Sequence, residues 1–266
     1  MQQTLESLPP VVFLGSFLAL WLWEGFAGAR RPARGPARKA RNLALTAVNV
    51  GVSIAAGTVL VAASLWIAQR DWGLAGVDWP PWSTVLLGVL ALDLTDYLRH
   101  RLTHNVPLLW RLHRVHHTDP QIDVTSSLRS HPLEQALRPL FEVTTIVLVG
   151  IAPLTLAVHA LVQIATVLFQ HANITLPPAL DRAIAWITPT PAYHLVHHSR
   201  LRMQTDSNYS ASLTLWDRLF GTLRPSDPRV RLGLDGFDAP RDQSLGGLLA
   251  NPWRAPAESG VSQAAS

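Results

Sequence analysis

The chain has 266 residues, of which 48% are hydrophobic and only 15% are charged. A soluble domain carries about 25% charged residues, so this composition favours a membrane protein. The chain contains no cysteine, which excludes disulfide bonds, thiolate zinc sites, Cys-ligated iron–sulfur clusters and cysteine nucleophiles. The chemistry that remains is that of histidine and carboxylate.

The net charge of +4 is concentrated in one place. A short loop between two apolar runs carries Arg30, Arg31, Arg34, Arg38, Lys39 and Arg41. Such a loop is typical of the cytoplasmic side of a membrane protein, under the positive-inside rule. We therefore place residues 29–41 in the cytoplasm and expect no nucleic-acid partner.

Three apolar runs precede the first histidines. Residues 10–28 and 43–68 are each long enough to span a bilayer, and a third run, 83–98, continues into His100 without a helix breaker. Neither a basic segment nor a cleavage motif accompanies the first run, so we expect an anchor and not a cleaved signal peptide. The pattern predicts an integral, multi-pass protein of the inner or cell membrane.

A fourth apolar region, residues 140–169, is interrupted at residues 150–153 by Gly-Ile-Ala-Pro. Proline there breaks or kinks a helix, and the first piece covers only about half of a ~30 Å hydrocarbon core. We therefore expect a helical hairpin. A hairpin would bring the histidines on either side of it to the same, cytoplasmic face, whereas a single crossing would separate them.

Histidine spacing gives the strongest chemical signal. Residues at i, i+3 and i+4 share one face of a helix, and this spacing occurs twice, with a further pair at i and i+4. The members are His113, His116 and His117; His194, His197 and His198; and His100 with His104. Neutral imidazole suits Fe, Zn, Cu and Ni. The spacing predicts a pair of metal ions, and His131 and His171 are further candidate ligands.

A lone buried histidine is more often a core residue with satisfied hydrogen bonds than a metal ligand. We apply this interpretation to His159, which lies inside an apolar run, although a polar group in a membrane can also line a substrate channel.

Five polar residues are candidates to orient the ligands by accepting a second ring N–H. They are Asp93, Asp96, Glu134, Asn173 and Asn208. Asp96 shares a helical face with His100, although it could instead pair with Arg99. Glu134 could orient a ligand or pair with Arg138 at i, i+4. The two asparagines, like Asp206, could simply serve turns.

In this order the motifs resemble those of the fatty acid hydroxylase / sterol desaturase superfamily of membrane non-haem di-iron enzymes. The resemblance covers about half of the chain. It rests on residues 96–104, 109–117, 129–134, 171–173, 194–198, 208–209 and 216–222. Two departures are the serine at position 210, where the family pattern has glycine, and the lack of a cytochrome b5 module.

The resemblance implies an all-α bundle of about four transmembrane helices, the last a hairpin, with a cytosolic helical cap that holds the metals. It implies O₂-dependent hydroxylation or desaturation of a lipid or sterol-like C–H bond by two iron ions. No catalytic residue is implied beyond the metal ligands. Electrons would come from a separate ferredoxin, cytochrome or reductase.

Three regions are expected. Residues 1–92 hold the first membrane helices and the basic loop, residues 93–224 hold the histidine motifs and the hairpin, and residues 225–266 form a polar, partly disordered tail. Other functions stay open: ether-lipid or carotenoid-type oxidation on the same fold, a membrane zinc hydrolase, or a histidine-rich metal-binding or transport protein. A transporter should hold its ligands near the bilayer midplane, whereas these lie at helix ends.

Overall fold

The computed structural model describes residues 2–28 and 35–257, and the predicted all-α fold is confirmed for these residues. The long helices are α1 (Gln2–Ala27), α2 (Gly35–Ala68), α3 (Pro81–Asn105), α5 (Pro132–Val149) and α6 (Pro153–His171). The short ones are α4 (Pro107–His117), α7 (Pro178–Ala185), α8 (Pro191–His197), α9 (Arg202–Thr205), α10 (Leu215–Leu219) and α11 (Leu245–Ala250). Single 3-10 turns are η1 (Gly73–Ala75), η2 (Val124–Leu128) and η3 (Asn251–Trp253).

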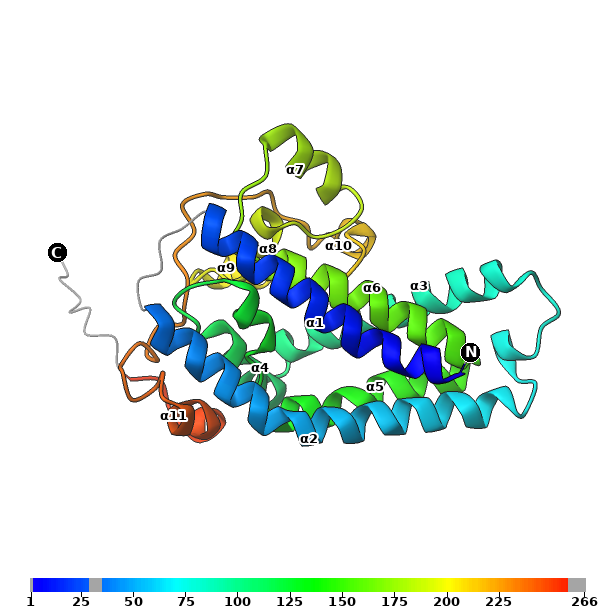
Figure 1. The fold of residues 1–266 in the computed structure, drawn as a ribbon. Coiled ribbons are helices and arrows are strands. Elements are labelled where there is room, and N and C mark those ends of the chain that lie inside the picture. Colours follow the sequence, from blue (N-terminus) through cyan, green and yellow to red (C-terminus); the bar gives the residue numbers. More distant parts are fainter. Residues whose placement is uncertain (1, 29–34, 258–266) are drawn as a thin grey trace.

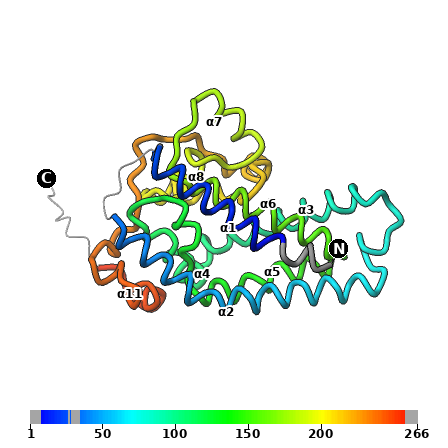
Figure 2. Tube along the Cα trace, viewed as in Figure 1, coloured from blue at the N-terminus to red at the C-terminus, as the bar shows by residue number. Residues whose placement is uncertain are grey.

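The long helices form an elongated bundle, and α4, α8, α9 and α11 gather at one end of it (Figure 1). Within the bundle, α1 packs on α6, α2 packs on α5, and α3 packs on both α5 and α6. The tube in Figure 2 shows the link from α2 to α3 at the opposite end, far from the gathered short helices. This arrangement leaves one end of the bundle to build a site.

Three helices are long and apolar enough to cross a membrane: Leu8–Phe26, Gly35–Ala68 and Pro153–His171. The predicted basic loop ends earlier than expected, because α2 already begins at Gly35 and contains Arg38, Lys39 and Arg41. Pro36 suits the first turn of a helix, and the Ala, Arg and Lys residues that follow are strong helix formers. Arg30, Arg31 and Arg34 lie outside the described residues.

The break predicted at residues 150–153 is present and makes a hairpin. Gly150 ends α5 with a φ of 78°, and α6 begins at Pro153. The start of α5 and the end of α6 both lie beside His116, whose ring nitrogens are 3.2 Å from the Arg129 carbonyl and 3.1 Å from His171 Nε2. The two helices therefore run in opposite directions.

A buried polar joint ties the first two helices to the segment that follows α4. Arg38 is 1% exposed and donates to Asp119 at 2.6 Å and to Asp123. Glu24 of α1 accepts backbone N–H groups of Val124 and Asn173, both at 2.7 Å. Because unpaired buried charges are costly, this joint holds the segments in one arrangement.

The described part of the predicted polar tail, residues 225–257, is packed against the rest of the protein. Arg114 of α4 donates to the carbonyls of Asn251 and Arg254 at 2.6 and 2.7 Å. Phe237 and Leu248 are buried. The polar composition of this segment thus reflects hydrogen bonds to α4 and not only exposure to solvent. Residues 258–266 lie outside the described residues.

Replacing Gly150 with alanine is expected to destabilise the hairpin. A Cβ atom there would lie 2.2 Å from the Trp72 carbonyl oxygen, and the φ of 78° is itself unfavourable for alanine. The expected result is a clearly lower thermal unfolding temperature in detergent. Gly57→Ala is the matched control, because a Cβ atom at Gly57 meets nothing within 4 Å. Equal unfolding temperatures for the two variants would contradict the tight turn.

Candidate metal centre

Nine histidines form two groups among the described residues, and within each group the ligand atoms lie within 4.8 Å of one another. The first group is His100, His104, His113, His117 and His197, and the second is His116, His171, His194 and His198. The two predicted histidine clusters therefore lie together, and each group contains histidines from residues 113–117 and from residues 194–198.

Helix ends position these side chains. His100 and His104 lie in the last two turns of α3, and Pro107 then starts α4 in a new direction, so that its last turns face them. His171 is the final residue of α6, and α8 supplies His194 and His197. The site therefore lies at the end of the bundle where these four helices meet.

Backbone carbonyls set the protonation of several rings. A carbonyl oxygen can only accept, so the Nδ1 atom facing it must carry the proton and Nε2 must carry the lone pair. Four histidines have this arrangement: His100 with the Tyr209 carbonyl at 2.7 Å, His116 with Arg129 at 3.2 Å, His171 with Val167 at 2.7 Å and His197 with Ser207 at 2.7 Å.

Carboxylate oxygens accept the Nδ1 proton of two more rings. Glu134 Oε1 lies 2.6 Å from His113 Nδ1, and Asp206 Oδ1 lies 3.3 Å from His104 Nδ1. A carboxylate on the second nitrogen fixes the ring and raises its basicity as a ligand. The geometry agrees with an orienting role for Glu134, and Asp206 lies within reach of His104 while its other oxygen pairs with Arg202 at 2.5 Å.

Burial favours the neutral form of the rings of His117, His194, His197 and His198, and the neutral form is the one that binds a metal. Burial, reinforced by neighbouring imidazoles, lowers the pKa of His117, His194 and His198 well below the usual range. Burial also lowers the pKa of His197 to about 3.

Several Nε2 atoms lie close to one another. His113 Nε2 is 3.2 Å from the Nε2 atoms of both His100 and His117, and His194 Nε2 is 3.1 Å from that of His198. Two metal–nitrogen bonds of about 2.1 Å at a right angle place their nitrogens about 3.0 Å apart. His104 Nε2 and His197 Nε2 are buried with no hydrogen-bond partner in the described part of the chain. Both groups therefore fit a bound cation.

His131 is not brought to either group. It caps the start of α5, where Nδ1 accepts from the Leu133 N–H at 3.2 Å, and its Nε2 lies 3.1 Å from the Leu249 carbonyl. Both ring nitrogens are therefore used, and no lone pair is left for a metal. The expectation that His131 is a ligand is corrected by this placement.

The acids of α3 are also placed differently from the prediction. Asp93 accepts from the Trp216 indole at 2.8 Å and from two backbone N–H groups, and so holds the loop before α10. Asp96 faces α5 and α6, pairs with Arg99 at 3.4 Å and lies 3.2 Å from Nε2 of His159. Neither carboxylate contacts a ring of the two groups, because both point away from the end of α3.

Asn208 supports a loop next to the site. It has a φ of 52° and makes side-chain hydrogen bonds with the Tyr193 carbonyl, at 2.9 Å, and the Arg224 N–H, at 2.7 Å. The backbone N–H of Asn173 donates to Glu24 at 2.7 Å, and the role of the Asn173 side chain stays a prediction.

Trp110 is part of the site and was not singled out from the sequence. Its ring lies 5.0 Å from that of His104 and 5.4 Å from that of His117. The guanidinium of Arg202 lies over the indole, 4.7 Å from the ring centroid. The indole shields the first group from water. Its position, three and seven residues before His113 and His117, places it on the same helical face.

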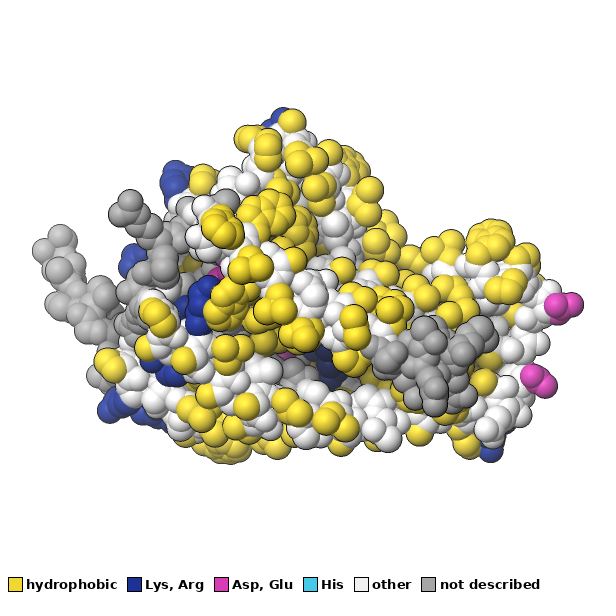
Figure 3. Space-filling view, in the orientation of Figure 1, with side chains coloured by type: hydrophobic (Ala, Val, Ile, Leu, Met, Phe, Trp, Pro, Cys, Tyr) yellow, Lys and Arg dark blue, Asp and Glu magenta, His cyan; other side chains and the backbone are white. Residues whose placement is uncertain are grey.

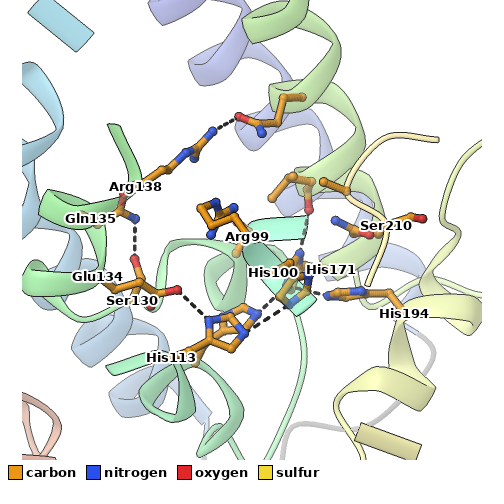
Figure 4. Close-up of a pocket in the computed structure, with 16 residues that line it drawn as sticks. Arg99, His100, His113, Ser130, Glu134, Gln135, Arg138, His171, His194 and Ser210 are labelled. Atoms are coloured by element: carbon orange, nitrogen blue, oxygen red, sulfur yellow. Dashed lines mark hydrogen bonds and ion pairs between the residues drawn. The ribbon is translucent and has the colours of Figure 1, made fainter. Parts of the chain in front are cut away.

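A cavity of about 120 Å³ adjoins both groups, and its walls include His113 of the first and His194 of the second (Figure 4). Arg99, Glu134 and Arg138 also line it. A small molecule in this cavity would therefore lie directly against both candidate metal positions.

Known proteins give a consistent comparison. A family model described as fatty acid hydroxylase matches residues 85–222. Alkylglycerol monooxygenase from Xenopus tropicalis is 29% identical over 84% of this chain and 48% of its own length. Ornithine lipid hydroxylase OlsE from Rhizobium tropici is 29% identical over 72% and 59%, and cholesterol 25-hydroxylase from Rattus norvegicus is 29% identical over 56% and 50%.

The chain spans about half the length of the curated relatives that it matches. No solved structure matches it.

Metal analysis of purified protein is expected to find two ions per chain. His194→Ala should lower the content, because it removes a ligand from the centre of the second group. His131→Ala is the matched control and should keep both ions, since its nitrogens bind backbone groups. Elemental analysis by mass spectrometry measures both. A full metal content in His194→Ala would remove that residue from the ligand set.

Glu134→Gln should weaken metal binding by about 10- to 100-fold, because the ring of His113 loses its carboxylate partner. Competition with a chelator measures the affinity. Glu142→Gln on the same helix is the control, because Glu142 pairs with Arg138 at 2.8 Å and not with a histidine. An affinity unchanged in Glu134→Gln would show that this contact does not support the metal.

Proposed function

Since this chain belongs to the fatty acid hydroxylase family, we propose that it hydroxylates a C–H bond of a membrane lipid at a centre of two iron ions, with O₂ as co-substrate. One observation carries the proposal. Two groups of neutral imidazoles direct bare Nε2 atoms to two neighbouring points, and one cavity adjoins both. The proposed ligands are the nine histidines of these groups.

Bound iron would supply the reduction of O₂ that oxidation of an unactivated C–H bond requires. The residues of the chain hold and shield that chemistry. Glu134 and Asp206 hold the rings of His113 and His104, and the indole of Trp110 covers the first group. Eight of the nine rings are buried and His100 is half-buried, which limits the contact of the rings with bulk water.

The relatives favour hydroxylation over desaturation. The three relatives are named as a monooxygenase of alkylglycerols, a hydroxylase of ornithine lipids and a hydroxylase of cholesterol. Each name describes insertion of oxygen into a lipid. We infer the same reaction type for this chain, and an ether lipid is one substrate that the proposal allows.

Metal transport fits the structure less well. A transporter binds its ion near the bilayer midplane and must release it. Here the rings lie at the ends of α3, α4 and α6, and six of them are locked by hydrogen bonds on Nδ1. Such fixed rings favour a resident cofactor.

The cytoplasmic side of the membrane is the proposed location of the centre. Arg38 and Lys39 lie at the start of α2, and Arg38 pairs with Asp119, two residues after His117. The basic end of α2 and the histidines thus share one end of the bundle, and basic residues favour the cytoplasm. We propose that a separate ferredoxin, cytochrome or reductase supplies electrons there.

Untargeted lipid profiling tests the reaction. Cells that express the protein should contain a lipid that has gained one oxygen atom, whereas a loss of two hydrogens would indicate desaturation. Cells that express His117→Ala or His197→Ala should lack the product, because each variant removes a ligand of the first group. Product formation by either variant at the wild-type level would contradict the proposed centre.

A further inference from the structure

The cavity beside the metal groups has polar side chains in its wall. Arg99, Gln135, Arg138, Gln163 and Gln170 line it together with serines, and the few apolar side chains include Val167 and Ala211. An alkyl chain in contact with these groups would remove water from them without replacing its hydrogen bonds, at a cost of about 1–3 kcal/mol for each group. These residues therefore give the cavity a place where a polar group can bind, beside its apolar surface.

Part of this wall is already fully paired and rigid. Arg138 of α5 donates to Glu142 at 2.8 Å and to Gln163 of α6, and Gln163 donates to Asp96 of α3. This network joins three helices and holds the side chains of this part of the wall in place. Arg99 also pairs with Asp96 at 3.4 Å, so two arginines face two carboxylates here and a net anion is not required of a bound molecule.

Four polar atoms of the wall are buried without a partner among the described residues: one oxygen each of Gln170 and Glu134, the hydroxyl of Ser210 and Nε of Arg99. A hydroxyl or amine could satisfy this Nε as an acceptor while it donates to the two oxygens. Gln170 is 3% exposed, and its Oε1 makes no hydrogen bond to the described residues. Glu134 holds His113 with Oε1, while its Oε2 is buried and free of protein partners. Buried polar atoms are nearly always satisfied in functional proteins. The two oxygens accept hydrogen bonds, so the ligand that satisfies them must donate.

The cavity is reached from the side. The Arg138 side chain keeps 32% of its area exposed. Figure 3 shows a hollow between α1 and α2 in which charged side chains are visible below a rim of hydrophobic ones. A lipid can approach along this apolar face with its tail in the bilayer and present a polar group to the interior.

We propose that the cavity binds a hydrogen-bond-donating headgroup of the lipid, through Gln170 and Glu134. The oxidised carbon then lies in the headgroup or within a few bonds of it, and not in the middle or at the end of an unsubstituted chain. This inference rests on the proposed function for the reaction, but the binding preference holds without it. Hydroxyl and amine hydrogens are the two sources of such donors.

A binding series tests the inference without turnover. Purified, metal-loaded protein in detergent is mixed, in the absence of reductant, with lipids that share a palmitoyl or hexadecyl chain. The probes are 1-monopalmitoylglycerol with two hydroxyls, its doubly O-methylated analogue, methyl palmitate, and hexadecylamine. Native mass spectrometry measures occupancy. The diol or the amine should bind at least about tenfold more tightly than the methylated analogue.

Variants locate the effect. Gln170→Leu should weaken binding of the preferred lipid by about tenfold, while the affinity for methyl palmitate stays the same. Gln69→Leu, at an exposed position at the far end of α2, is the matched control and should change neither. The metal content of Gln170→Leu is measured as well, so that a disturbed His171 is recognised.

The outcomes separate two failures. Equal binding of the diol, the amine and the methylated analogue by the wild-type protein would overturn the headgroup site, even if Gln170→Leu does not fold. Preference for the diol assigns hydroxyls, and preference for the amine assigns an amino headgroup. A headgroup preference without any oxidised lipid in cells would leave the cavity assignment standing and defeat the proposed hydroxylation.

Discussion

The hydrogen bond on Nδ1 is the interaction on which the candidate centre depends. In six of the nine histidines a carbonyl or carboxylate holds that nitrogen, and the opposite nitrogen is left with its lone pair toward the centre. Without these acceptors an imidazole could rotate or take the other tautomer, and Nε2 would become a donor. The loops that carry Ser207 and Tyr209 are therefore as much a part of the site as the helices.

Sequence spacing predicted the histidines well because ligand chemistry restricts both residue type and helical position. The i, i+3, i+4 pattern placed His113, His116 and His117 on one face, and the break at Gly150 predicted the hairpin that brings His194 to them. The same reasoning failed for His131, whose neighbourhood is set by Leu249, a residue 118 positions away. Periodicity describes one helix at a time and contains no information on such distant partners.

The partners of the carboxylates could not be predicted from helical spacing either. Asp96 shares a helical face with His100, yet its side chain contacts Arg99 and His159, because α5 and α6 provide partners on that side. Asp206 lies in a loop and was left undecided, yet it reaches His104. Spacing within a helix predicted which faces exist. Packing between helices determines which carboxylate contacts which imidazole ring. It also places Trp110 against the ring of His104.

The length of α2 has a consequence for how the protein sits in a membrane. Its 34 residues make a rod of about 51 Å, while a hydrocarbon core is about 30 Å thick. Near its start, the amides of Asn42 and Asn49 bind Thr125 at 3.0 Å and the Ser130 carbonyl at 2.8 Å, next to the histidines. This one helix therefore links the candidate centre to the membrane-spanning part of the chain. In a thicker or thinner bilayer the cavity would lie at a different height relative to the lipid headgroups.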